Sequence, residues 1–203
     1  MTAWRAVAAR AASLMLRYPD AEVLGTLPTI AEALGGLPDT VAGPLRQVVE
    51  YRTAASATEL QKSYVETFDL RLRCCLYLSY YKAGDTRRRG ETLVSFAEAY
   101  RNAGLEVDGE LPDYLPAVLE LAATDEVGWA LLREYRIGLD MLTEALSGRR
   151  SPYQHALRAV VAMLPAASPA ERAAAARLAR TGPPLEMVGL EPYGLVDTTG
   201  ARR

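Results

Sequence analysis

Apolar side chains recur at steps of three and four residues through most of the sequence, which is the spacing of one face of an α-helix. No stretch longer than a few residues alternates apolar with polar side chains, and no internal repeat is present. At 151–154 and 168–171, Ser-Pro-x-Gln and Ser-Pro-x-Glu combine an N-cap serine, a proline at the first helical position and a capping-box partner. The sequence therefore predicts an all-α fold, a single-domain helical bundle of about eight to nine helices.

Proline, glycine and capping residues set the expected helix boundaries. The motif Ser56-x-x-Glu59 is a capping box in front of a long central helix, and Gly104 supplies a left-handed C-cap. In chain order the predicted helices cover 4–18, 20–34 in one or two pieces, a helix to about 53 that Gly43-Pro44 opens or interrupts, the central stretch as far as a break at 83–86, 87–104, 112–122, 125–146, 151–164 and a last one from 168. Residues 1–184 are expected to form one helical domain, and 185–203 an extended or disordered tail with little periodicity.

The charge is nearly balanced overall but uneven along the chain. A net charge of −2 argues against a dedicated nucleic-acid binder, which usually carries a strongly basic face. Residues 105–132 contain seven acids and no lysine or arginine, whereas 149–180 contain six arginines and one acid. Such a separation of acidic and basic segments predicts either charged partners or an acidic face and a basic face that pair within the protein.

Several kinds of chemistry are disfavoured by residue type and spacing. Cys74 and Cys75 are adjacent, so they form no disulfide framework, and with His155 as the only histidine they lack the spacing of a zinc site. No glycine-rich phosphate loop is present, and Glu110 with Asp113 lacks the cationic or metal partner of a general acid–base pair. We therefore expect no catalytic residues, no metal and no cofactor, although a small helical enzyme stays a third alternative.

Two further features bear on location. No apolar run approaches the ~20 residues that span a bilayer. The first helix is interrupted by Arg5 and Arg10, so it does not resemble a signal peptide. A cytoplasmic protein without membrane insertion is the expectation.

The stretch 64–89 is rich in aromatic residues, with five of the fifteen Tyr, Phe and Trp residues of the sequence. Tyr64, Phe68, Leu72 and Leu76 recur at four-residue steps, which predicts a stripe along one helix face that continues to Tyr80. Such a stripe is either plain core or the wall of a peptide-binding groove. The arginines at 87–89 fit phosphate contacts, or a solvated or internally paired cluster.

Four ordered blocks in and after this stretch carry a resemblance to a known family. They are Tyr64-Val65-x-Thr67-Phe68-Asp69, Leu76-Tyr77-Leu78 with Tyr80-Tyr81, Gly84-Asp85-x-Arg87-x-Arg89-Gly90, and Glu110-Leu111-Pro112-Asp113-Tyr114-Leu115-Pro116. Together they resemble the NarJ branch of the TorD/NarJ redox-enzyme maturation chaperones, also called nitrate reductase delta subunits. The relatives that serve sulfoxide and amine-oxide reductases have an Asp-His pair where this protein has Asp113-Tyr114.

The resemblance implies a function in nitrate assimilation and anaerobic respiration. It implies a chaperone that binds the N-terminal segment of the apo nitrate reductase alpha subunit as an amphipathic helix in a groove. The chaperone would hold that subunit while molybdenum cofactor and iron–sulfur clusters are installed, and would delay membrane docking. Molybdenum cofactor biosynthesis proteins are further implied partners. The alternative is a helical regulatory or structural subunit retained in an oxidoreductase complex.

The resemblance also assigns roles to residues. The expected peptide-binding residues, with the acids as an anionic rim, are Tyr64, Phe68, Leu72, Leu76, Tyr80, Glu110, Asp113 and Tyr114. The expected structural residues, which fix neighbouring helices, are Asp69, Gly84, Asp85, Arg87, Arg89, Gly90 and Pro112.

Overall fold

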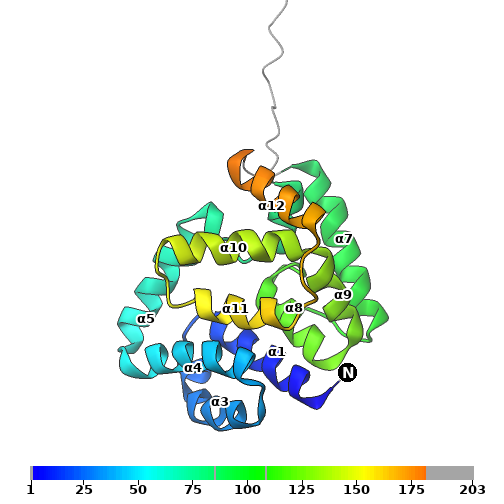
Figure 1. The fold of residues 1–203 in the computed structure, drawn as a ribbon. Helices are drawn as coiled ribbons and strands as arrows, with labels where there is room; N and C mark the ends of the chain where they lie inside the picture. Colours follow the sequence, from blue (N-terminus) through cyan, green and yellow to red (C-terminus); the bar gives the residue numbers. More distant parts are fainter. Residues whose placement is uncertain (1, 85, 108, 182–203) are drawn as a thin grey trace, which may run out of the picture.

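A computed structural model describes residues 2–84, 86–107 and 109–181 (Figure 1). The described part of the protein is all-α, as predicted, and its only strand-type pairing is a single bridge between Tyr77 and Tyr114. The helices are α1 (Ala3–Leu16), α2 (Ala21–Gly25), α3 (Leu27–Ala33), α4 (Asp39–Ala54), α5 (Ala57–Tyr64), α6 (Leu78–Ala83), α7 (Arg87–Asn102), α8 (Leu115–Thr124), α9 (Glu126–Glu134), α10 (Arg136–Gly148), α11 (Gln154–Ala162) and α12 (Pro169–Thr181). None of them combines the length and apolar character needed to cross a membrane.

The described residues hold twelve α-helices, more than the eight to nine expected, because predicted helices divide. The stretch 125–146 bends at Tyr135, which ends α9 and precedes α10. In the 20–34 region α2 ends at Gly25 and α3 begins at Leu27, with Thr26 between them and Pro28 in the first turn of α3. Helix α4 begins at Asp39, before Gly43-Pro44, so Pro44 lies inside this helix and does not open it.

The core forms where α1 lies between α8 and α11, with α4 beside it and α10 above α11 (Figure 1). Alanines 8, 9, 11 and 12 are buried on α1, and their small side chains let neighbouring helices approach closely. The α8–α9 corner is tighter still, since a Cβ on Gly128 would lie 2.2 Å from the backbone nitrogen of Ala122. Only glycine fits that crossing.

One buried cation ties α4 to the end of α1. The Arg52 guanidinium donates hydrogen bonds to the carbonyls of Leu14, Met15 and Arg17 at 2.7–3.2 Å, and it lies 5.6 Å from the Tyr153 ring centroid. These carbonyls are among those that a helix end leaves without an intrahelical partner. Burial lowers the pKa of Arg52, and the neighbouring tyrosines oppose that shift. The guanidinium of Arg52 therefore caps the carboxyl end of α1.

The capping motifs have different outcomes. Ser56 and Glu59 form the predicted reciprocal box at the start of α5, and Ser168 with Glu171 does the same before α12. Gly104 has the predicted left-handed backbone, with φ +70°. Ser151, however, does not cap a helix: its buried hydroxyl has no hydrogen-bond partner among the described residues, and α11 begins only at Gln154.

The prediction of one continuous central helix is wrong. After α5 the backbone widens into a π-turn over Val65–Asp69, bends at Leu70, makes a 3₁₀ turn over Leu72–Cys74, and runs extended before α6. The stripe of Tyr64, Phe68, Leu72 and Leu76 is therefore not one face of a helix. Leu72 is 71% exposed, whereas the other three side chains are buried.

Candidate functional site

The site is organised by a pairing between two segments far apart in sequence. The Leu78 N–H donates to the Asp113 carbonyl at 3.0 Å, and the Leu115 N–H donates to the Leu76 carbonyl at 2.8 Å. The Tyr77–Tyr114 bridge lies between these bonds, and the two rings are 5.5 Å apart. The acidic loop before α8 is thereby fastened to the extended segment before α6.

Aromatic rings form the floor beside this pairing. The Tyr64 ring packs edge-on against Tyr18, with 5.4 Å between ring centroids, and it also packs against Phe68, with 4.8 Å between centroids. The Phe68 ring in turn packs against Tyr153 at a centroid distance of 4.9 Å. The Tyr64 hydroxyl lies 3.1 Å from the Leu16 carbonyl and 3.0 Å from the Tyr114 hydroxyl. The π-turn supplies Phe68, and π-turns inside helices occur frequently at functional sites.

Two adjoining hollows make one groove. A cavity of about 210 Å³ is lined by Tyr18, Tyr64, Phe68, Asp69, Leu76, Tyr77, Glu110 and Tyr114. A second hollow of about 490 Å³ shares Tyr18, Glu110 and Tyr114 with it and continues along α1 and α8. We call the two together the acidic groove. Five of the eight predicted peptide-binding residues, Tyr64, Phe68, Leu76, Glu110 and Tyr114, line its smaller cavity.

The acidic groove carries an excess of negative charge. Glu120 at its far end is matched by Arg10 at 2.9 Å and Arg17 at 3.8 Å. Asp69, Glu106 and Glu110 are exposed and form no salt bridge within the described part of the chain. Glu110 accepts only a long hydrogen bond, 3.3 Å, from the Tyr77 hydroxyl. These carboxylates are available to a cationic ligand.

Three tyrosines of the groove, Tyr64, Tyr77 and Tyr114, have raised pKa values and stay protonated at neutral pH. Burial raises the pKa of Tyr77 to about 12, with a further contribution from the negative charge of Glu110. Burial also raises the pKa values of Tyr64 and Tyr114. The groove therefore presents neutral aromatic walls with hydroxyl tips, a surface that suits wet and partly apolar interfaces.

Asp113 does not belong to the rim, which corrects the sequence-based prediction. Its side chain is fully buried, and its Oδ2 accepts hydrogen bonds from the backbone N–H and the hydroxyl of Ser79. Arg89 donates from Nε to the same Ser79 hydroxyl at 3.2 Å. A carboxylate at the start of α6 is also favoured by the helix dipole. Asp113 is a structural residue that locks the loop onto α6.

Leu72 and Tyr80 are likewise separated from the acidic groove. Both line a different and larger cavity between the Leu70–Cys74 loop, α6, α10 and α12. Asp69, by contrast, was predicted as a structural residue and lies in the lining of the acidic groove. The bend at Leu70 separates Asp69, which faces the acidic groove, from Leu72, which faces the other cavity, and the extended segment before α6 returns Leu76 to the groove.

The remaining motif residues support the helices around the break. Gly84 has φ +63°, a left-handed value that favours glycine at the end of α6. Arg89 lies over the Tyr77 ring at 5.7 Å, and Arg87 opens α7. A Cβ on Gly90 would meet nothing within 4 Å, so no close approach explains that glycine. Pro112 lies in a turn before α8 rather than inside the helix, and Asp85 falls outside the described residues.

No group of three or more metal-ligating side chains occurs among the described residues. Burial lowers the pKa of His155, and burial raises the pKa values of Cys74 and Cys75. A neutral imidazole on α11 and protonated thiols lack the arrangement of a nucleophile and its base.

Three residues important to the site were not among the predicted site residues. Tyr18 and Tyr77 line the small cavity, and Arg52 lies against the ring of Tyr153, which in turn contacts two rings of that cavity. A signal for Arg52 was present, because it continues the helical spacing of the buried residues Leu45 and Val48. Tyr77 belongs to one of the blocks that carry the family resemblance, but no local pattern placed it at the cavity, since its position depends on pairing with a loop more than thirty residues away.

The fold has a solved counterpart. The crystal structure of a redox enzyme maturation protein from Archaeoglobus fulgidus superposes with a TM-score of 0.57 at 23% identity, covering 77% of this chain and 91% of that one. The protein therefore has the all-helical fold of a redox-enzyme maturation protein.

Sequence comparisons narrow this class to one family. The family model "Nitrate reductase delta subunit" matches residues 30–159. A Bacillus subtilis protein named nitrate reductase molybdenum cofactor assembly chaperone NarJ is 31% identical over 166 residues, 79% of this chain and 89% of that protein. The chain belongs to the nitrate reductase delta subunit family of NarJ-type assembly chaperones.

A longer relative is more similar in sequence. The nitrate reductase-like protein NarX of Mycobacterium tuberculosis is 42% identical over 160 residues, which is 77% of this chain but 24% of NarX. The chain thus spans about a quarter of that relative's length.

Proposed function

We propose that this protein binds the N-terminal segment of an apo nitrate reductase alpha subunit in the acidic groove. It holds the subunit while molybdenum cofactor is inserted and delays docking to the membrane. The observation that carries the proposal is the convergence on one cavity of four aromatic rings and an acid, Glu110, that forms no salt bridge with another described residue; the rings are those of Tyr64, Phe68, Tyr77 and Tyr114. An amphipathic leader helix offers the matching chemistry, with apolar residues for the rings and basic residues for the carboxylates.

The groove suits a reversible holder. Its aromatic walls bury the apolar face of a segment, while the exposed carboxylates attract its cations and raise the association rate. Release must then follow from differential affinity, because a ligand that binds two states of its partner equally shifts neither. The protein would bind the open apo subunit more tightly than the mature, docked enzyme.

Copurification from nitrate-grown cells tests this difference. In cells that cannot make molybdenum cofactor, the tagged protein is expected to carry the alpha subunit, and in cofactor-replete cells the mature enzyme is expected to lack it. Glu110→Lys should weaken the capture, whereas Glu50→Lys, an exposed acid on α4 outside the groove, should not. Equal capture of the apo and mature enzymes would contradict the proposal.

A second candidate, a helical subunit retained in an oxidoreductase complex, is favoured by one observation. The region similar to this protein is part of a much longer nitrate reductase-like protein in Mycobacterium tuberculosis. That candidate predicts a fixed ratio of this protein to mature enzyme after purification. The same experiment therefore separates the two functions.

A further inference from the structure

A second surface, which the proposed leader binding does not use, lies on the other side of the bend at Leu70. The loop Leu70-Arg71-Leu72-Arg73 alternates apolar and cationic side chains, and Leu70 and Leu72 are 72% and 71% exposed. Behind them lies a cavity of about 650 Å³ between this loop, α6, α10 and α12. We call it the arginine cavity. Exposed leucines beside a hollow of this size are typical of an interaction site.

The walls of the arginine cavity are apolar where they meet the helices. Met141 and Ala145 of α10 and Leu178 of α12 line it together with the ring of Tyr81. Tyr81 is held in place because its hydroxyl donates to the carbonyls of Arg73 and Cys75 at 3.2 and 2.9 Å. The cavity is therefore a formed hollow with room for apolar side chains.

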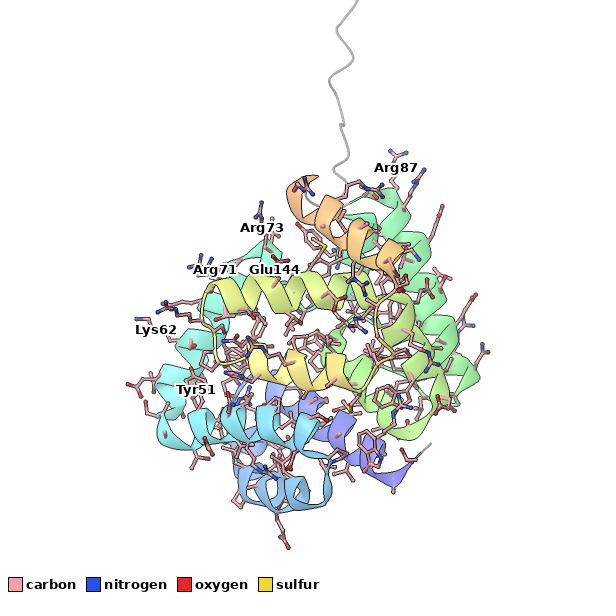
Figure 2. All side chains as sticks on the ribbon, in the orientation of Figure 1. Tyr51, Lys62, Arg71, Arg73, Arg87 and Glu144 are labelled. Atoms are coloured by element: carbon pink, nitrogen blue, oxygen red, sulfur yellow. The ribbon has the colours of Figure 1, made fainter. Side chains whose placement is uncertain are left out.

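The rim of the cavity is cationic. Arg71, Arg73 and Arg149 line it against the single acid Glu144, and Figure 2 shows Arg71 and Arg73 beside α10 near Glu144. No salt bridge joins any of the three arginines to another described residue. The Nε of Arg71 donates to the Glu66 carbonyl at 2.9 Å, which fixes that side chain at the edge. Planar guanidinium groups of this kind suit bidentate recognition of carboxylates.

From this geometry we propose that the arginine cavity binds an acidic amphipathic segment of a partner protein, with leucine-type side chains in the hollow and carboxylates on the arginines. The positive charge of the rim determines which kind of segment binds, because the arginines repel a basic leader and attract an acidic segment. The two surfaces of the protein thus select segments of opposite charge. This inference stands apart from leader binding and does not depend on it.

Fluorescence anisotropy with the full-length protein tests the proposal. The probe is a labelled synthetic helix with leucine at i, i+3, i+4 and i+7 and glutamate on its other positions, and its control carries lysine in place of glutamate. The glutamate peptide is expected to bind and the lysine peptide not. Arg73→Glu with Arg149→Glu should weaken binding by at least about tenfold, and Leu72→Ser by a few-fold.

Control variants show whether binding depends on the arginine cavity itself, on the acidic groove or only on the net charge of the protein. Neither Arg73 nor Arg149 holds another described residue by a side-chain hydrogen bond or a salt bridge, so their replacement should leave the fold intact, which circular dichroism checks. Arg46→Glu with Arg101→Glu makes the same charge change on α4 and α7 and should leave affinity unchanged. Glu110→Gln should also leave it unchanged.

Other results would overturn the proposal. Absence of binding by the glutamate peptide, or binding that survives the Arg73 and Arg149 changes, excludes the arginine cavity as its site. If these changes instead make residues 182–203 newly sensitive to protease, the occupant is the protein's own C-terminal segment and no partner is needed. If they dissociate a dimer in sedimentation experiments, the occupant is a second copy.

Discussion

The acidic groove and the arginine cavity share the stretch 64–81 as part of their walls, but they differ in charge and in the exposure of their apolar side chains. Residues before Leu70 turn inward, so Tyr64 and Phe68 are buried among aromatic rings, whereas Leu72 lies open to solvent. The groove has carboxylates without salt-bridge partners among the described residues, and the cavity has arginines without them. One aromatic-aliphatic pattern is therefore divided between two surfaces of opposite charge, because the backbone leaves the helical path after Tyr64: Leu72 lies at the arginine cavity, and Leu76 returns to the acidic groove.

The largest expected effect distinguishes a buried residue of the stripe from its exposed residue. Phe68→Ala removes a ring packed between Tyr64 and Tyr153 and should cost about 3–5 kcal/mol of unfolding free energy. Leu72→Ala should change it by less than about 0.5 kcal/mol, since the side chain is exposed. Urea unfolding measures both. Equal losses would restore the interpretation of one buried stripe.

Asp113 should behave as part of the frame that holds the acidic groove. Asp113→Asn weakens the bonds to Ser79 in a buried site and should cost about 1–3 kcal/mol of stability. Glu110→Gln, on the exposed rim of the same loop, is the control and should be neutral. Thermal melts compare the two. A neutral Asp113→Asn that alters only the salt dependence of peptide binding would return this residue to the rim.

High pH should loosen the tyrosine-lined side of the molecule. Free tyrosine has a pKa of about 10, and burial raises the pKa values of Tyr77 and Tyr153 to about 12. Because the unfolded protein loses these protons first, the stability is complete below pH ~10 and falls as pH rises toward 12. Chemical unfolding at a series of pH values, with the absorbance of tyrosinate, would show this. Flat stability up to pH 12 would contradict the burial of these rings.

The smallest expected effect concerns the segment that was predicted to be a tail. Ending the protein at Pro184 should shift the unfolding free energy by no more than about 0.5 kcal/mol, because 185–203 lack apolar periodicity. These residues lie outside the described structure. A fall of many degrees in the melting temperature would show that they cover part of the molecule, and the arginine cavity would be the first place to look.

Local patterns predicted the helices well where local interactions determine them. The helix at 87–104 is seen as Arg87–Asn102 followed by the left-handed Gly104, and the box at Ser56 and Glu59 starts α5 as expected. The central helix was wrong for a physical reason. The backbone between Leu76 and Leu78 gives up helical bonds to pair with the loop at Asp113 and Leu115, and such long-range pairing leaves no trace in local periodicity.

The same distinction applies to the site. Tyr64, Phe68, Leu76, Glu110 and Tyr114 were predicted as site residues, and they meet at one cavity. Asp113 was misplaced because an acidic loop suggests exposure, while its burial depends on Ser79 of another element. Composition can indicate a charged surface, but it cannot show which of two neighbouring carboxylates points inward.

Leader binding in the acidic groove is tested most directly by isothermal titration of the full-length protein with a synthetic N-terminal peptide of the cognate alpha subunit at two ionic strengths. We expect binding that weakens with salt, and a roughly threefold to tenfold loss for Glu110→Gln, because one carboxylate of the rim is removed. Arg73→Glu with Arg149→Glu should leave the affinity unchanged. If Glu110→Gln leaves the affinity unchanged and Arg73→Glu with Arg149→Glu alters it, the peptide binds in the arginine cavity, which would contradict leader binding in the acidic groove.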